Sequence, residues 1–275
     1  MSHSAKNQLA GHSSLAITVL RLADDHLVLG HRLSEWCGHA PMLEEDLSMP
    51  NMALDLLGQS LALYEYLVDV NATTEAGASS PPNEASSRFD SADAYAYLRR
   101  EKEYLNCLLV EKPDQDFAFA MLKQLYFSAF MLPFWQAMQT STDEQLCAIA
   151  AKAELEITYH LRHSGEWVIR LGDGTQGSHQ RMQDAVDYLH RYTGELFFTD
   201  AHYDSCVDAG QTPDLSLIKA KWDATVKDVF ELASLVTPEV KFTQGGGREG
   251  RHTEDFGFLL AELQYMQRAY PGAQW

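Results

Sequence analysis

Apolar positions recur along the chain at helical spacing, and they predict a protein built almost entirely of helices. Between residues 15 and 36 an apolar side chain returns every three or four residues, and the run stops at Gly38 and Pro41, which suit a helix end. Comparable runs cover about 43–70, 92–110, 117–142, 143–171, 178–198, 215–235 and 253–270. Strand-like alternation is almost absent, so the pattern indicates an all-α fold with additional helices toward the C-terminus.

Two segments fall outside this helical pattern. Residues 71–90 are small, polar and proline-containing, which predicts a mobile loop inside one domain rather than a linker between two. Residues 1–12 lack the apolar stretch of a signal peptide, and we expect a flexible N-terminus there. We therefore expect a single domain over residues 1–275.

One predicted helix has an unusual composition. Residues 117–142 contain no Asp or Glu, although the chain carries 39 acidic residues. The segment reads as a long apolar helix that Pro133 is expected to bend. We expect its aromatic side chains to take part in contact with a partner chain; they are Phe117, Phe119, Tyr126, Phe127, Phe130, Phe134 and Trp135.

Charge and composition exclude several classes of function. A net charge of −18 would repel a phosphate backbone, so nucleic acid is not an expected partner. No uninterrupted run of about 18 apolar residues is present, so we expect no membrane span and a cytoplasmic location. The cysteines are widely spaced without a CxxC motif, which indicates reduced, buried thiols and neither a zinc nor a redox site.

Four polar residues lie within or beside apolar stripes and form the candidate site: Asp25, Asp55, Glu156 and His160. Buried polar groups need partners, because burial without them costs several kcal/mol. In a carboxylate-bridged dimetal bundle, two helices each supply a Glu and the other two each supply a Glu-x-x-His motif. These four residues are therefore candidates for the ligands of such a dimetal site.

The chain departs from the dimetal ligand set on three helices. Asp55 is followed three residues later by Gly58 instead of a histidine, and Glu156 and His160 are four residues apart rather than three. The acid-free helix offers only Gln124 and Ser128. We therefore favour a metal-free buried cluster. The alternative is a dimetal oxygenase site with an unusual ligand set, which could include His190, although Asp187 and His190 are more simply interpreted as a surface pair.

The segment 241–252 is locally basic and rich in glycine. Glycines let backbone N–H groups approach an anion, and Lys241, Arg248 and Arg251 would favour negative charge. One interpretation is contact with coenzyme phosphates or with an acidic partner. The other is an interhelix loop that packs against a neighbouring subunit.

Several longer motifs together carry a family resemblance: residues 32–41 (RLSEWCGHAP), 55–59 (DLLGQ), 108–113 (LLVEKP), 159–163 (YHLRH), 171–175 (LGDGT), 246–254 (GGREGRHTE), 260–268 (LAELQYMQR) and 271–275 (PGAQW). They resemble the C subunit of bacterial phenylacetyl-CoA epoxygenase, the ring 1,2-epoxidase of phenylacetate degradation. The likeness extends over nearly the whole chain, apart from the first dozen residues and the 71–90 loop.

The resemblance implies a ferritin-like helical bundle within a multicomponent monooxygenase. It also implies a homologous A subunit that holds a di-iron centre and binds phenylacetyl-CoA, a small B subunit and an iron–sulfur flavin reductase. The C subunit of that family supports A as a heterodimer and lacks a working metal centre. We therefore expect a structural, non-catalytic subunit without a cofactor of its own.

Overall fold

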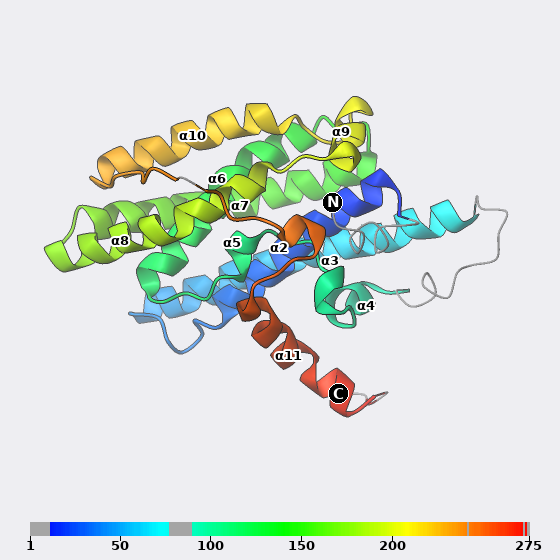
Figure 1. Ribbon diagram of the computed structural model, residues 1–275, viewed down its shortest axis with the longest axis horizontal. Coiled ribbons are helices and arrows are strands. Elements are labelled where there is room, and N and C mark those ends of the chain that lie inside the picture. The colour runs from blue at the N-terminus through cyan, green and yellow to red at the C-terminus, as the bar shows by residue number, and fades with distance from the viewer. Residues whose placement is uncertain (1–11, 77–89, 241, 272, 274–275) are drawn as a thin grey trace.

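The computed structural model describes residues 12–76, 90–240, 242–271 and 273, and every regular element among them is a helix (Figure 1). This confirms the all-α prediction. The predicted flexible N-terminus lies almost entirely outside the described residues, as does most of the predicted loop. Residues 71–76 of that loop instead continue a helix, α3, which spans Leu43–Ala76 and holds Pro50 inside it.

Four long helices form the central bundle: α2 (Ser14–Ser34), α3, α6 (Phe117–Met138) and α7 (Glu144–Gly172). α2 packs against α3 and α6 packs against α7. Side chains at the helix starts accept backbone N–H groups, as Asp116 does for α6 and Asp143 for α7. One continuous hydrophobic cluster runs from Ala16 to Leu260 and joins these helices to the rest of the chain.

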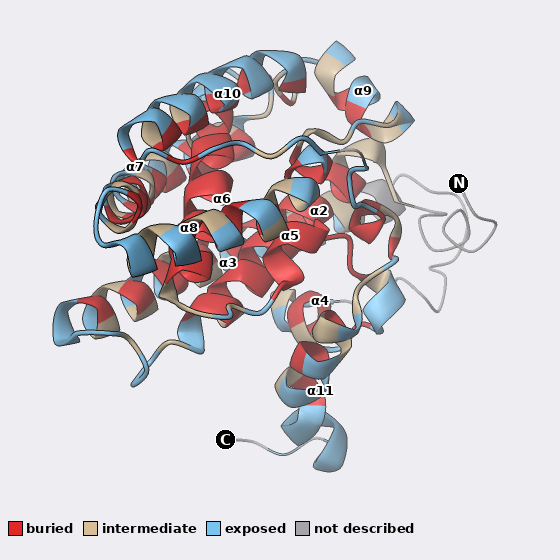
Figure 2. Cartoon of the chain, turned by 60° about the vertical axis from the view of Figure 1, so that its left-hand side comes forward, coloured by how far each residue is buried: buried red, intermediate tan, exposed pale blue. Residues whose placement is uncertain are grey.

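The remaining helices cover the bundle: α8 (Gln176–Leu189), η3 (His190–Phe197), α9 (Ala201–Asp208), α10 (Leu215–Leu232) and α11 (Glu254–Ala269). α8 and α10 pack on α6, and α9 packs on α2. Figure 2 shows buried positions concentrated in the central helices, whereas α8 and α10 present exposed outer faces. α11 projects from one side of the bundle toward the C-terminus (Figure 1).

The prediction of one helix over residues 92–110 is wrong. The segment is divided into α4 (Ala92–Tyr97), a 3-10 turn η2 (Glu101–Glu103), an extended stretch and α5 (Leu108–Glu111). In the extended stretch the backbone N–H groups of Leu105 and Cys107 donate to Asp24 and Asp25 of α2, both at 2.7 Å. These carboxylates replace the helical carbonyl acceptors that residues 105 and 107 would otherwise use.

The acid-free helix is a core element, and our prediction that its aromatic side chains contact a partner is wrong for all of them except Phe117, which is partly exposed. Phe119, Phe127 and Trp135 are each 5% exposed or less, and Tyr126, Phe130 and Phe134 are similarly buried. α6 is apolar enough and long enough to cross a membrane, but 89% of its most apolar 18 residues are buried inside this chain. A helix that is apolar on all sides belongs in the middle of a bundle, which is where α6 lies.

Candidate functional site

The four central helices enclose a group of polar side chains, which we call the polar cluster. α2 contributes His26, α3 contributes Asp55 and Gln59, α6 contributes Gln124 and Ser128, and α7 contributes Glu156 and His160. His26, Gln124, Ser128 and His160 are completely buried. The cluster therefore occupies the centre of the bundle, where the facing helices of a dimetal carboxylate protein carry their ligands.

Two hydrogen-bonded pairs join α3 to α7 across the cluster. His160 Nε2 lies 3.0 Å from Asp55 Oδ2, and Gln59 Nε2 donates to Glu156 Oε2 at 2.8 Å. Each helix contributes two residues four positions apart, and the order of the partners is reversed because α3 and α7 run antiparallel. The structure thus brings Asp55, Glu156 and His160 to the same contact between α3 and α7.

The hydrogen bonds assign a single tautomer to His160. Gln124 Nε2 lies 3.2 Å from His160 Nδ1, and an amide nitrogen can only donate. Nδ1 must therefore be the acceptor, so Nε2 carries the proton and donates it to Asp55. The same amide of Gln124 also donates to the hydroxyl of Ser128 at 3.2 Å. His160 is thus held in one orientation between an amide and a carboxylate.

His26 is the contribution of α2 to the cluster. Its Nδ1 lies 2.7 Å from the carbonyl oxygen of Leu22 and must donate to it. Burial lowers the pKa of His26 to about 4, so the ring is neutral at pH 7. Its ring packs edge-on against Phe127, with centroids 5.2 Å apart. Within the described part of the chain, His26 Nε2 and the Oε1 atoms of Gln59 and Gln124 make no hydrogen bond.

The donor set does not fit a dimetal site. Carboxylates come from only two helices of the cluster, as Asp55 and Glu156, and each already accepts a hydrogen bond from across the α3–α7 contact. At Gln59 and Gln124 the side chains are amides, which bring no negative charge. Among the described residues no three His, Cys, Asp or Glu side chains lie close enough together to hold a metal ion.

Asp25 lies outside the polar cluster, so its placement there was wrong. Its carboxylate is fully buried and accepts from Cys107 N and from Arg248 Nη2, both at 2.7 Å. α2 is buried all round from Ala16 to Gly30, so Asp25 faces inward without facing the cluster. Its neighbour in sequence, His26, is the residue that α2 presents to the cluster.

The arginines of the glycine-rich segment take different positions. Arg248 is only 6% exposed, and its guanidinium donates to Asp25 and to the carbonyl of Leu105. Its prediction as a phosphate contact is therefore wrong, because the charge is already paired inside the protein. Arg251 is exposed and pairs with Glu249. Lys241 lies outside the described residues.

Sequence reasoning missed a set of buried carboxylates that hold the irregular segments. Glu195 accepts from the backbone N–H groups of Leu108, Gly246 and Arg248, at 2.8, 2.7 and 3.1 Å. Glu111 accepts from His252 and from both the N–H and the hydroxyl of Thr253. These contacts attach residues 246–253 firmly to the bundle. For Asp24 and Asp25, which hold Leu105 and Cys107 in the same way, the signal in the sequence was two adjacent carboxylates inside a largely apolar run.

Asp187 and His190 do not form a site. Asp187 is exposed and accepts from Gln183, whereas His190 turns inward, with its Nδ1 3.1 Å from the hydroxyl of Tyr126. The two residues thus have separate partners.

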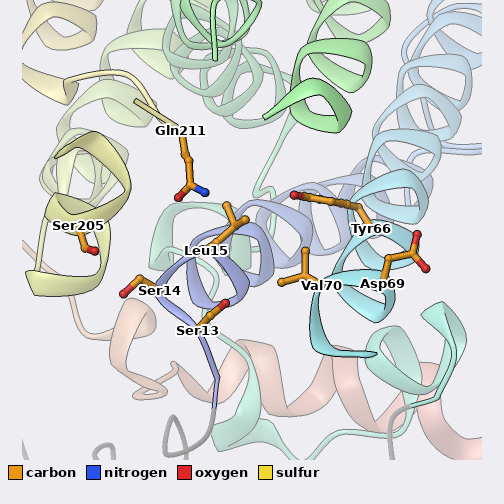
Figure 3. Close-up of a pocket in the computed structure, with 8 residues that line it drawn as sticks. All are labelled: Ser13, Ser14, Leu15, Tyr66, Asp69, Val70, Ser205 and Gln211. Atoms are coloured by element: carbon orange, nitrogen blue, oxygen red, sulfur yellow. The ribbon is translucent and has the colours of Figure 1, made fainter. Parts of the chain in front are cut away.

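A surface hollow of about 640 Å³ lies beside the start of α2, between α3 and α9 (Figure 3). Its lining residues are Ser13, Ser14, Leu15, Tyr66, Asp69, Val70, Ser205 and Gln211. Asp69 is the single charged group in that lining, and its charge is negative. The hollow is therefore unsuited to the phosphates of a coenzyme.

A four-helix core with a polar cluster at the dimetal position defines a ferritin-like bundle whose ligand set is incomplete. Over residues 1–275 the chain matches the family described as phenylacetic acid catabolic protein, and it belongs to that family. It is similar to the C subunit of 1,2-phenylacetyl-CoA epoxidase from Escherichia coli (strain K12). The two are 40% identical over 263 residues, which cover 96% of this chain and 100% of the relative.

Proposed function

We propose that this chain is a structural, non-catalytic subunit of a phenylacetyl-CoA 1,2-epoxidase in aerobic phenylacetate degradation. In this role it pairs with a homologous di-iron subunit and supports it, while the small B subunit and the reductase complete the enzyme. The observation that carries the proposal is the polar cluster. In a chain similar throughout to the C subunit of an epoxidase, Gln59 and Gln124 hold amides where metal ligation would call for charged donors.

The chemistry of the cluster supports a role without a metal. A dimetal centre needs carboxylates to balance its charge and to bridge the ions. Here the two carboxylates, Asp55 and Glu156, are already neutralised in part by hydrogen bonds to His160 and Gln59. The family resemblance supports the cytoplasm as the location of the complex, and so does the burial of α6 inside the chain.

The test is co-expression with the di-iron subunit, followed by metal analysis of each chain. We expect this chain purified alone to contain no stoichiometric iron, and the pair to contain two irons that remain with the other subunit after separation. Epoxidation of phenylacetyl-CoA should require both chains. Two tightly bound irons in this chain alone would overturn the proposal.

The alternative is a catalytic dimetal subunit that uses Asp55, Glu156 and His160 in an unusual ligand set. Its discriminating variant is Asp55→Asn with Glu156→Gln, which keeps the hydrogen-bonding shape and removes both charges. A structural role predicts unchanged iron content and turnover in the assembled complex. The alternative predicts that both fall together, because the ligands have been neutralised.

A further inference from the structure

The outer sides of α3 and α7 carry large apolar side chains that remain exposed in the part of the chain that the structure describes. The members are Leu43, Leu47, Leu54 and Leu61 on α3 and Leu155 and Tyr159 on α7. Leu54 is 65% exposed and Leu155 is 73% exposed. We call this surface the α3–α7 face. Single exposed leucines are ordinary, but a contiguous group of this kind marks an interaction site.

The two rows form one surface because the polar cluster joins the helices directly beneath them. Leu54 adjoins Asp55, which bonds to His160, and Leu155 adjoins Glu156, which bonds to Gln59. At one end of the face, His163 Nε2 lies 2.9 Å from Glu45, and the ring of Tyr159 packs on His163 with centroids 5.7 Å apart. The apolar rows therefore lie side by side.

The spacing on α3 is that of a helix–helix seam. Leu47, Leu54 and Leu61 recur every seven residues, with Leu43 four residues earlier. Apolar residues at heptad spacing pack against another helix along its length. At 1.5 Å per residue the row extends about 27 Å, enough for several turns of a partner helix.

Gly58 gives the most specific indication of what covers the face. It lies in the middle of α3, between Leu54 and Leu61, and a Cβ built on it meets no atom within 4 Å. No contact within the described chain therefore requires glycine there, although glycine weakens a helix interior through its conformational freedom. A glycine at such a position lets a second backbone approach closely.

We propose that the α3–α7 face binds the partner subunit and that a helix of that subunit crosses α3 at Gly58. The inference rests on the proposed function. The α3 row, about 27 Å long and one helix width of about 10 Å across, gives about 270 Å², and Leu155 and Tyr159 of α7 extend it toward the ~800 Å² per partner of a standard interface. A second copy of this chain is a poor occupant, because each copy carries a net charge of −18.

The test compares two glycine positions that both have room for a side chain. Gly58→Trp fills the proposed crossing point, and Gly177→Trp is the matched control on α8, where a Cβ meets only the Thr175 hydroxyl at 4.0 Å. Binding of each variant to the purified di-iron subunit is measured by calorimetry, and folding is checked by thermal unfolding. We expect at least a tenfold loss of affinity for Gly58→Trp and none for Gly177→Trp.

A second variant keeps the inference testable if Gly58→Trp folds poorly. Leu54→Ser with Leu155→Ser removes two exposed apolar side chains, and we expect the same loss of affinity with an unchanged midpoint of unfolding. Wild-type affinity in this variant, or in a folded Gly58→Trp, would overturn the inference.

Two further outcomes separate the inference from the function on which it rests. If the wild-type chain does not bind the di-iron subunit at all, the proposed function itself fails. If the wild-type chain forms a homodimer that Gly58→Trp breaks, the occupant is a second copy and the named partner is wrong.

Discussion

The placement of Arg248 leads to a prediction about stability instead of ligand binding. Arg248 Nη2 lies 2.7 Å from Asp25 Oδ2, and its Nη1 donates to the carbonyl of Leu105 at 3.2 Å. The Asp25 side chain is 0% exposed and that of Arg248 is 7% exposed. Arg248→Ala would leave a fully buried carboxylate whose remaining hydrogen-bond partner is Cys107, through its backbone N–H and its side chain.

The expected cost is large because the remaining charge cannot reach water. Removing one partner of a buried ion pair typically destabilises a protein by about 3–5 kcal/mol. For a chain of this size about 1 kcal/mol lowers the midpoint of unfolding by ~2–4 °C, so Arg248→Ala should lower it by about 10 °C. The control is Arg251→Ala, because the Arg251 side chain is 56% exposed and pairs with Glu249 at the surface, and it should cost less than about 1 kcal/mol.

The assay is thermal and urea unfolding followed by circular dichroism at two pH values. Burial raises the pKa of Asp25, and loss of the guanidinium would raise it further. A folded-state pKa above the unfolded one means that stability is present at low pH and lost as the pH rises. The loss of unfolding free energy caused by Arg248→Ala, relative to the wild type, should therefore be larger at pH 7 than at pH 5. Equal, small losses for both arginine variants would refute this reasoning.

Three further predictions concern side chains outside that ion pair. Burial alone would lower the pKa of His252, but its hydrogen bond with Glu111 raises the pKa above its usual value. The His252–Glu111 pair therefore stabilises the fold fully below about pH 6.5, and this stabilisation is lost as the pH rises above that value. In unfolding measurements across pH 6–9, the Glu111→Gln variant should not show this loss of stability at alkaline pH. Burial lowers the pKa of His26 to about 4, so its contribution is present above pH 6.5 and lost as the pH falls toward 4. This loss amounts to about 3 kcal/mol, so the free energy of unfolding of His26→Gln should fall less steeply at acid pH than that of the wild type. Equal slopes for the two proteins would show that the His26 ring titrates normally. Cys37 is exposed, whereas Cys107 and Cys206 are buried, so a thiol reagent should show a fast phase that Cys37→Ser removes. A fast phase that survives this substitution would contradict the assignment.

Helices with one polar and one apolar side could be predicted closely. The run expected over 143–171 is α7, Glu144–Gly172, and the run expected over 253–270 is α11, Glu254–Ala269. Each has a cap or a break at its ends and a clear solvent side, so the periodicity reports both its extent and its orientation.

For helices that are buried on every side, the sequence could not predict which residues face which neighbour. α2 is buried at every position from Ala16 to Gly30, and α6 is nearly as enclosed. Periodicity shows which side faces solvent, and these helices have no such side. For this reason the sequence could not show that His26 rather than Asp25 faces the cluster.

The conformation of the segment between Arg99 and Glu111 depends on hydrogen-bond partners far away in the sequence. Its extended part is held by Asp24 and Asp25, about eighty residues earlier, and its end by His252 and Thr253, more than a hundred residues later. Local propensity favours a helix there. Buried carboxylates that accept backbone N–H groups stabilise the extended form instead, and no local pattern encodes them.

The distribution of charge in the polar cluster supports a core that works without a metal. The carboxylates that remain, Asp55 and Glu156, lie at its edge with side chains 37% and 22% exposed, where water can solvate them. Deeper inside, Gln124 is fully buried and neutral. A bound cation would stabilise a carboxylate at that depth, whereas without one its burial would cost several kcal/mol. An amide still bonds to His160 and Ser128 without that cost. The cluster can therefore fix how α6 and α7 pack while the α3–α7 face above it stays exposed.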